Sequence, residues 1–225
     1  MLRKHPHWLR RLFFCVTVLL SVTLLTGDVN AKKKKKQTPN VIVMTNIQSF
    51  DKVFREAQKA NGKLKTAQAN IRNSKIALRT ALNLKKNSTY SQGLKELKRR
   101  ARGKVKLFVN QGKFQLKATD AVPTGVQKGI KAVNQLTRTI PQSLKSLKGV
   151  TTDSKRMAQQ VENFPANIQT ELSNQGDNGV GLASKLPKAT RQTLNNIKVI
   201  QTMPKRAART THHLVEITKM LKEVF

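Results

Sequence analysis

The sequence predicts an all-α protein, arranged as an elongated antiparallel helical bundle or coiled coil of four to five helices behind an N-terminal signal segment. Apolar residues recur every three or four positions along most of the chain, which is typical of the buried side of packed helices. No stretch alternates apolar and polar residues for long, so no sheet is expected. The only cysteine is Cys15, so packing alone must hold the chain together once the signal segment is removed.

Residues 1–31 contain the three parts of a signal peptide in the usual order. A basic start without acidic residues leads into an apolar run from Leu12 to Leu25, and small residues then offer a cleavage site after Ala31. We expect cleavage, which would release a secreted, periplasmic or cell-envelope protein. A retained segment would leave the protein membrane-anchored, although a span needs about 20 apolar residues. A mitochondrial presequence is the third alternative, but its amphipathic, serine-rich pattern is absent.

A short tail precedes the helical part of the chain. Residues 32–43 begin with a run of lysines and are predicted to form a basic flexible tail, whereas residues 44–225 form a helical domain. The first apolar stripe runs from Met44 to Ala81 at helical spacing and predicts a long first helix. The polar sequence Asn87-Ser88-Thr89 ends this helix.

Four further stripes predict the remaining helices in chain order. The second stripe covers residues 94–116, the third 126–147 and the fourth 158–172, and the last runs over 182–221. Residues 173–181 are rich in glycine and asparagine, which tolerate positive φ, and are therefore predicted to form a loop. Long helices are thus expected at both ends of the domain.

Five prolines punctuate the second half of the domain, and each follows an apolar residue. Pro141 and Pro204 fall where the apolar stripes continue in phase, so kinked or restarted helices are expected there instead of hairpins. Pro123 and Pro187 each begin a stretch with apolar residues 7, 10 and 13 positions later. This is a weak internal repeat.

The domain is divided into two sub-halves, residues 44–122 and residues 123–225, and both copies of the repeat lie in the second. The amphipathic, proline-spaced helices of residues 123–225 resemble in architecture those of exchangeable apolipoproteins, which lie on lipid. The resemblance concerns the architecture alone, and no residue role is carried over from it.

Residues that could carry catalysis are few after the signal segment. His212 and His213 are adjacent, so on a helix they point about 100° apart and cannot both bind one metal. The ten acidic residues after residue 31 are scattered singly, and no two form the facing pair that general acid–base catalysis needs. No nucleophile-elbow, zinc-protease or phosphate-loop motif is present. We therefore expect no enzyme activity, no cofactor, no metal site and no small-molecule substrate.

Basic residues give the strongest functional signal. After residue 31 the chain has 40 Lys and Arg against 10 Asp and Glu, a net charge of +30. The densest cluster, residues 95–106, has seven cations and one acid. We predict that this cluster binds an anionic partner, because so large a surplus makes a chain repel itself. The predicted binding residues are Lys95, Lys98, Arg99, Arg100, Arg102, Lys104 and Lys106.

Several anionic partners fit this charge: lipopolysaccharide, an acidic polysaccharide, an anionic lipid surface or a nucleic acid. Lysines outnumber arginines, which favours diffuse attraction over bidentate recognition. The leading interpretation is an exported, non-enzymatic structural or binding protein that associates with polyanionic surfaces. A lipid-associating amphipathic-helix protein and a helical protein-interaction scaffold or effector are the alternatives. The apolar stripes contain many Ala, Thr and Asn residues, so a homo-oligomer would bury more surface than a monomer.

Overall fold

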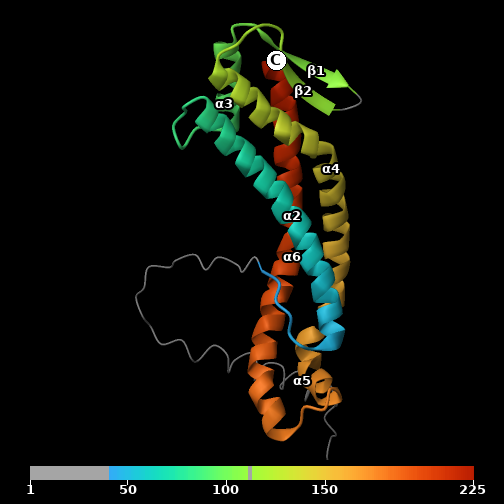
Figure 1. Ribbon diagram of the computed structural model, residues 1–225. Helices are drawn as coiled ribbons and strands as arrows, with labels where there is room; N and C mark the ends of the chain where they lie inside the picture. Colours follow the sequence, from blue (N-terminus) through green and yellow to red (C-terminus); the bar gives the residue numbers. More distant parts are fainter. Residues whose placement is uncertain (1–40, 111–112) are drawn as a thin grey trace, which may run out of the picture. The chain divides into compact units, whose positions relative to one another are not determined.

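The computed structural model describes residues 41–110 and 113–225, which belong to one unit of the chain. Within them the chain forms five α-helices and one β-hairpin (Figure 1). The elements are α2 (Gln48–Ala81), α3 (Tyr90–Ala101), β1 (Val105–Asn110), β2 (Lys113–Ala118), α4 (Thr124–Gln160), α5 (Phe164–Asn174) and α6 (Gly179–Val224). The mainly helical class is therefore confirmed. The signal segment and residues 32–40 of the tail lie outside the described residues.

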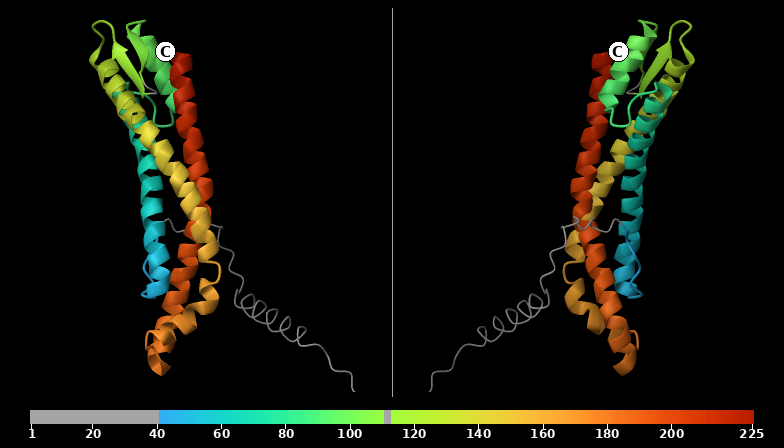
Figure 2. Two further views of the ribbon diagram at one scale, coloured as in Figure 1. Left: turned by 90° about the vertical axis from the view of Figure 1, so that its right-hand side faces the viewer. Right: turned by 90° about the vertical axis from the view of Figure 1, so that its left-hand side faces the viewer.

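The long helices α2, α4 and α6 lie side by side, and α4 runs in the opposite direction to the other two (Figures 1 and 2). Helix α5 lies at the end where α6 begins, whereas α3 and the hairpin lie at the end that holds the C-terminus. None of the described helices combines the length and the apolar composition that a membrane span would require.

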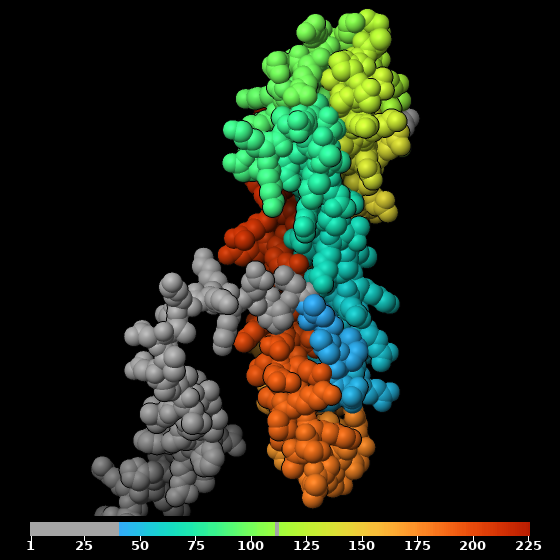
Figure 3. Space-filling view, turned by 60° about the vertical axis from the view of Figure 1, so that its left-hand side comes forward, coloured from blue at the N-terminus to red at the C-terminus, as the bar shows by residue number. Residues whose placement is uncertain are grey.

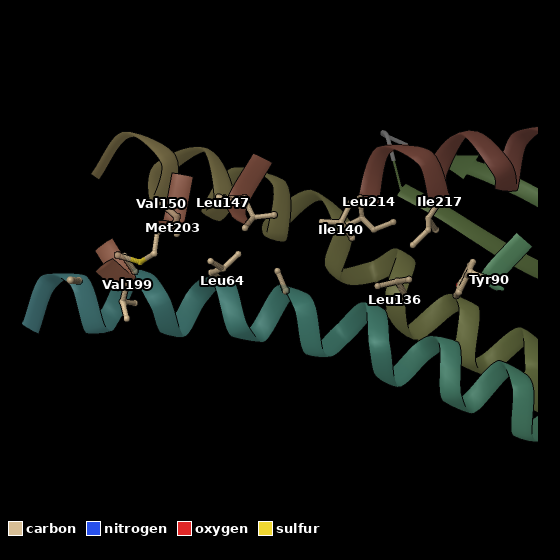
Figure 4. Close-up of a cluster of buried hydrophobic side chains, with 14 of the residues drawn as sticks. Leu64, Tyr90, Leu136, Ile140, Leu147, Val150, Val199, Met203, Leu214 and Ile217 are labelled. Carbon is tan, nitrogen blue, oxygen red and sulfur yellow. The ribbon is translucent and has the colours of Figure 1, made fainter. Parts of the chain in front are cut away.

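Apolar side chains from the three long helices form one continuous core. Its residues include Leu64 of α2, Leu136, Ile140, Leu147 and Val150 of α4, and Val199, Met203, Leu214 and Ile217 of α6 (Figure 4). Burying side chains of this size stabilises the fold by about 1.5–3 kcal/mol each. The polar positions in the first stripe, Asn61 and Ser74, are also buried. The helical spacing of the stripes therefore does mark the packed faces.

Prolines lie inside two of the long helices without ending them. Pro141 lies within α4, and both Pro187 and Pro204 lie within α6. A proline in a helix removes one backbone hydrogen bond and bends the axis. The prediction that the chain continues as helix through Pro141 and Pro204 is confirmed.

The sequence prediction is wrong for residues 105–110 and 113–116, which it assigns to the second helix and which belong to two antiparallel strands. Helix α3 ends at Arg102 and Gly103, whose φ angles of 49° and 79° are left-handed. Beyond this turn the apolar residues alternate, and Leu107 pairs with Leu116 on the side that meets the core. The spacing of the apolar residues from Val105 onward fits a helix and a strand equally well, so periodicity alone misleads here.

Side-chain amides hold two extended segments against the helices. Asn134 of α4 accepts a hydrogen bond from the Leu116 backbone N–H and donates one to the Leu116 carbonyl, both at 2.8 Å. Asn196 of α6 makes the same pair of bonds with Val43, at 3.0 and 2.6 Å. The last residues of the predicted tail, 41–43, therefore lie against α6, and Ile42 is buried among core residues.

Candidate functional site

The predicted binding cluster, residues 95–106, begins on α3. Side-chain hydrogen bonds cap the N-terminus of this helix. The Thr89 side chain accepts a hydrogen bond from the Gln92 backbone N–H, and the Gln92 side chain accepts one from the Thr89 N–H. This capping box fixes the first turn. Lys95, Lys98 and Arg102 are all exposed, and their spacing of three and four residues places them on one face.

Two arginines of the cluster are held by its one acidic residue. Arg99 and Arg100 form ion pairs with Glu96 at 2.6 and 2.7 Å. Their hydrogen bonds lower the pKa of the Glu96 carboxyl to about 2. Two of the seven predicted cations thus share a carboxylate, which reduces the charge that they present to an external anion.

The cluster continues past α3 into the hairpin, where one more cation is paired. Lys104 forms an ion pair with Asp120 at 2.8 Å, and this contact lowers the pKa of the Asp120 carboxyl. Lys106 lies on β1 directly opposite Lys117 of β2. Like charges at paired positions destabilise a hairpin unless an anion lies between them. The Lys117 ammonium also lies over the Phe108 ring, 5.1 Å from its centroid.

The structure therefore divides the predicted cluster into two groups. Arg99, Arg100 and Lys104 pair with carboxylates of the chain. The other four cations are exposed and form no ion pair with any described residue: Lys95, Lys98, Arg102 and Lys106. These four are the residues of the predicted cluster that can meet an external anion without losing an internal partner, and we call them the α3 patch.

A second basic site, which the sequence analysis does not predict, lies between α2 and α6. It is a groove of about 410 Å³, which we call the α2–α6 groove. Its lining residues are Gln68, Ile71, Arg72 and Lys75 of α2 and Arg206, Arg209, Thr210 and His213 of α6. The groove thus carries three arginines, a lysine and a histidine, and no carboxylate lines it. Figure 3 shows the surface of α6 in red beside that of α2 in teal.

Arg206 is a half-buried cation of the groove. Its guanidinium donates a hydrogen bond to the Asn61 side-chain oxygen at 3.2 Å. Partial burial lowers the pKa of Arg206, because water is excluded from a charge that no carboxylate balances. The Gln68 side chain of α2 donates a hydrogen bond to the Thr210 hydroxyl of α6 at 3.2 Å, which links these two helices.

Only part of the groove is visible in the sequence. Lys205, Arg206 and Arg209 form a recognisable basic cluster in the last helix. Arg72 and Lys75, however, lie more than 130 positions earlier in the chain, on a helix rich in cations throughout. Nothing in a single sequence states that α2 lies beside α6, so the convergence of these side chains requires the fold.

Across the described residues, cations far exceed their internal partners. Residues 41–225 include 35 Lys and Arg but 10 Asp and Glu. Six of those cations form ion pairs with carboxylates within the described residues. The same residues hold no cluster of three or more His, Cys, Asp or Glu placed to bind a metal ion. His212 and His213 are both exposed, with ring centroids 6.4 Å apart.

Comparisons of the chain with protein-family models, with curated proteins and with solved structures found no match.

Proposed function

We propose that this chain is an exported, non-enzymatic binding protein that attaches to polyanionic surfaces through basic helices. The observation that supports it is the balance of charge: six of 35 cations in residues 41–225 pair with carboxylates of the described chain. The others form no ion pair with a carboxylate of the described residues. Binding of this kind releases counterions and weakens steeply as salt concentration rises.

Retention on immobilised heparin and lipopolysaccharide tests the proposal. The mature chain should stay bound above physiological salt, about 0.15 M. A chain that elutes below that concentration from both matrices does not attach to polyanions under the conditions of a cell surface, and the proposal fails.

Two variants with four Lys or Arg changed to Gln locate the binding surface. The first neutralises the α3 patch. The second is a matched control of four exposed cations of α2 that form no ion pair with described residues. These are Lys52, Arg55, Lys59 and Lys63. The α3-patch variant should elute at distinctly lower salt than the control. Equal shifts would mean that the charge acts collectively and that the α3 patch is not a site.

A second candidate, association with anionic lipid, rests on the hairpin. Phe108 and Val109, adjacent residues of β1, are 44% and 56% exposed. Lys106, Lys113 and Lys117 lie on the same two strands. Apolar side chains flanked by lysines are typical of segments that insert shallowly into anionic membrane surfaces.

Vesicles of phosphatidylglycerol and phosphatidylcholine distinguish the two candidates. Apolar insertion is not screened by salt, so a lipid-associating protein stays bound to vesicles at about 1 M salt, whereas a purely electrostatic one dissociates. Changing Phe108 and Val109 to Ser should abolish the salt-resistant fraction. The matched control changes Ile76 and Val215, which are 41% and 48% exposed on α2 and α6. Salt-resistant binding that survives the first variant would exclude the hairpin as the inserted segment.

A further inference from the structure

We propose that the α2–α6 groove is a discrete binding site for a compact, multiply charged oxyanion made of adjacent phosphate or sulfate groups. The inference deepens the proposed function, on which it rests, because it assigns one defined site within the general charge surplus. The ligand groups could belong to a free polyphosphate, a sulfated or phosphorylated sugar chain, or a lipid headgroup, which share this chemistry.

The first argument is convergence. Arg72 and Lys75 reach the groove from α2, and Arg206, Arg209 and His213 reach it from α6. Helix α2 and helix α6 are both packed into the common core, so these side chains stand on a rigid frame. Charged groups held on rigid elements bind with a smaller loss of conformational entropy than those on loops.

The second argument is the lack of internal compensation. None of the four Lys and Arg of the groove forms an ion pair with a carboxylate of the described residues. Arg206 is partly withdrawn from water and touches the neutral amide of Asn61. A partly buried cation without a counter-charge is unfavourable until an anion arrives, and a guanidinium binds phosphate or sulfate through two parallel hydrogen bonds.

The third argument is size and polarity. A groove of about 410 Å³ lies within the range of small-ligand sites and has room for more than one phosphate or sulfate group. Four Lys and Arg side chains line it, and the Gln68 side chain adds an uncharged amide. The cationic side chains of this lining suit an anion with several oxygen atoms.

Calorimetric titration of the mature chain with tripolyphosphate at about 0.15 M salt tests the site. Saturable binding with a stoichiometry of one is expected. Changing Arg72 and Arg209 to Gln should weaken binding roughly tenfold or more, because two charge-assisted contacts are lost. Both residues are exposed, so helicity and thermal unfolding should change little.

The matched control changes Arg55 and Arg191 to Gln, which removes the same charge from the same two helices outside the groove. It should weaken tripolyphosphate binding by less than about twofold, as screened distant charges do. Equal weakening by the two variants, or the absence of saturable binding in the unaltered chain, would overturn the proposal.

Competition then identifies the source of the anion. A heparin hexasaccharide and vesicles that contain phosphatidic acid are each tested for displacement of tripolyphosphate. Displacement by one of them assigns the groove to sugar sulfates or to lipid phosphates, and displacement by neither assigns it to free polyphosphate.

Failure of this inference is separable from failure of the proposed function. A groove variant that loses tripolyphosphate but keeps full heparin retention supports the groove and places surface attachment elsewhere. A chain that binds tripolyphosphate with a stoichiometry of one yet elutes from heparin and lipopolysaccharide at low salt retains the groove and loses the surface-binding function.

Discussion

Tyr90 takes part in a buried hydrogen-bond network in which the Ser74 side chain joins three helices. The Ser74 hydroxyl of α2 donates to the Ala132 carbonyl of α4 at 2.9 Å, so its oxygen is left to accept from the Tyr90 hydroxyl of α3, 3.2 Å away. Burial raises the pKa of the Tyr90 phenol to about 12. The phenol is therefore kept neutral at a position where an ionised form would be costly.

The raised pKa of Tyr90 makes stability depend on alkaline pH. The unfolded phenol ionises near pH 10 and the folded one near pH 12, so the contribution is complete below pH 10 and is lost as pH rises to about 12. The loss is at most about 2–3 kcal/mol. Because Tyr90 is the one tyrosine of the chain, its phenolate absorbance titrates alone. A midpoint near pH 10 would contradict the buried environment.

Tyr90→Phe is the control for that titration. The variant keeps the ring and lacks the ionisable group, so the alkaline decline in the free energy of unfolding should become shallower than in the unaltered chain. At neutral pH it should cost about 1 kcal/mol, the usual value for one lost hydrogen bond.

Glu96 restrains the basic cluster of α3, and removing its charge should increase polyanion binding. Glu96→Gln frees Arg99 and Arg100 from their carboxylate and raises the net charge by one. The chain should therefore elute from heparin at higher salt. The stability cost should stay below about 1 kcal/mol, because Arg99 is exposed, Arg100 is half-buried and solvent screens both pairs. Asp153→Gln is the control, since Asp153 forms no ion pair with described residues. An equal shift for both variants would show that net charge alone governs retention.

At the scale of elements, the amide of Asn196 holds the segment before α2 at Val43. Asn196 is buried and makes both hydrogen bonds to the Val43 backbone. Asn196→Ala should lower the free energy of unfolding by about 1–3 kcal/mol, since it leaves both backbone groups of Val43 without these bonds. Hydrogen exchange should show faster exchange at Val43 with little change at Leu116, which the similar amide of Asn134 still holds. Unchanged protection of Val43 would show that packing of Ile42 and the hydrogen bonds of Asp51 to Thr45 and Asn46 secure the segment without this amide.

The elements differ in how well the sequence predicts them. Helix α2 is predictable because its apolar spacing persists for many turns, and even Asn61 and Ser74 occupy the buried stripe. The hairpin is not predicted, because Val105, Phe108 and Leu116 also fit helical spacing. Two features of the folded chain favour strands over a helix in this segment. One is the left-handed turn after α3, and the other is the amide of Asn134, which bonds to the β2 backbone.

At the scale of the molecule, composition predicts a large surplus of positive charge, but it does not predict which cations can bind an external anion. The sequence marks residues 95–106 as the densest cluster, and Glu96 and Asp120 then pair with three of its cations. The α2–α6 groove has fewer cations per residue of sequence, yet no carboxylate lines it. Whether a cation can bind an external anion depends on which helices are neighbours and where the few acidic residues lie. Both are properties of the folded chain.

The same imbalance predicts that salt stabilises the fold. Residues 41–225 hold 35 Lys and Arg against 10 Asp and Glu, so repulsion between unpaired cations outweighs the six ion pairs. Raising sodium chloride from about 0.01 to 0.15 M shortens the screening length from about 30 to 8 Å. The melting temperature should therefore rise by about 2–4 °C, equivalent to roughly 1 kcal/mol for a domain of this size. The variant of α2 with four cations changed to Gln should respond less, because it has less repulsion to screen. A melting temperature that falls with salt would mean that the ion pairs dominate, and that the surplus cations are too widely spaced to repel one another.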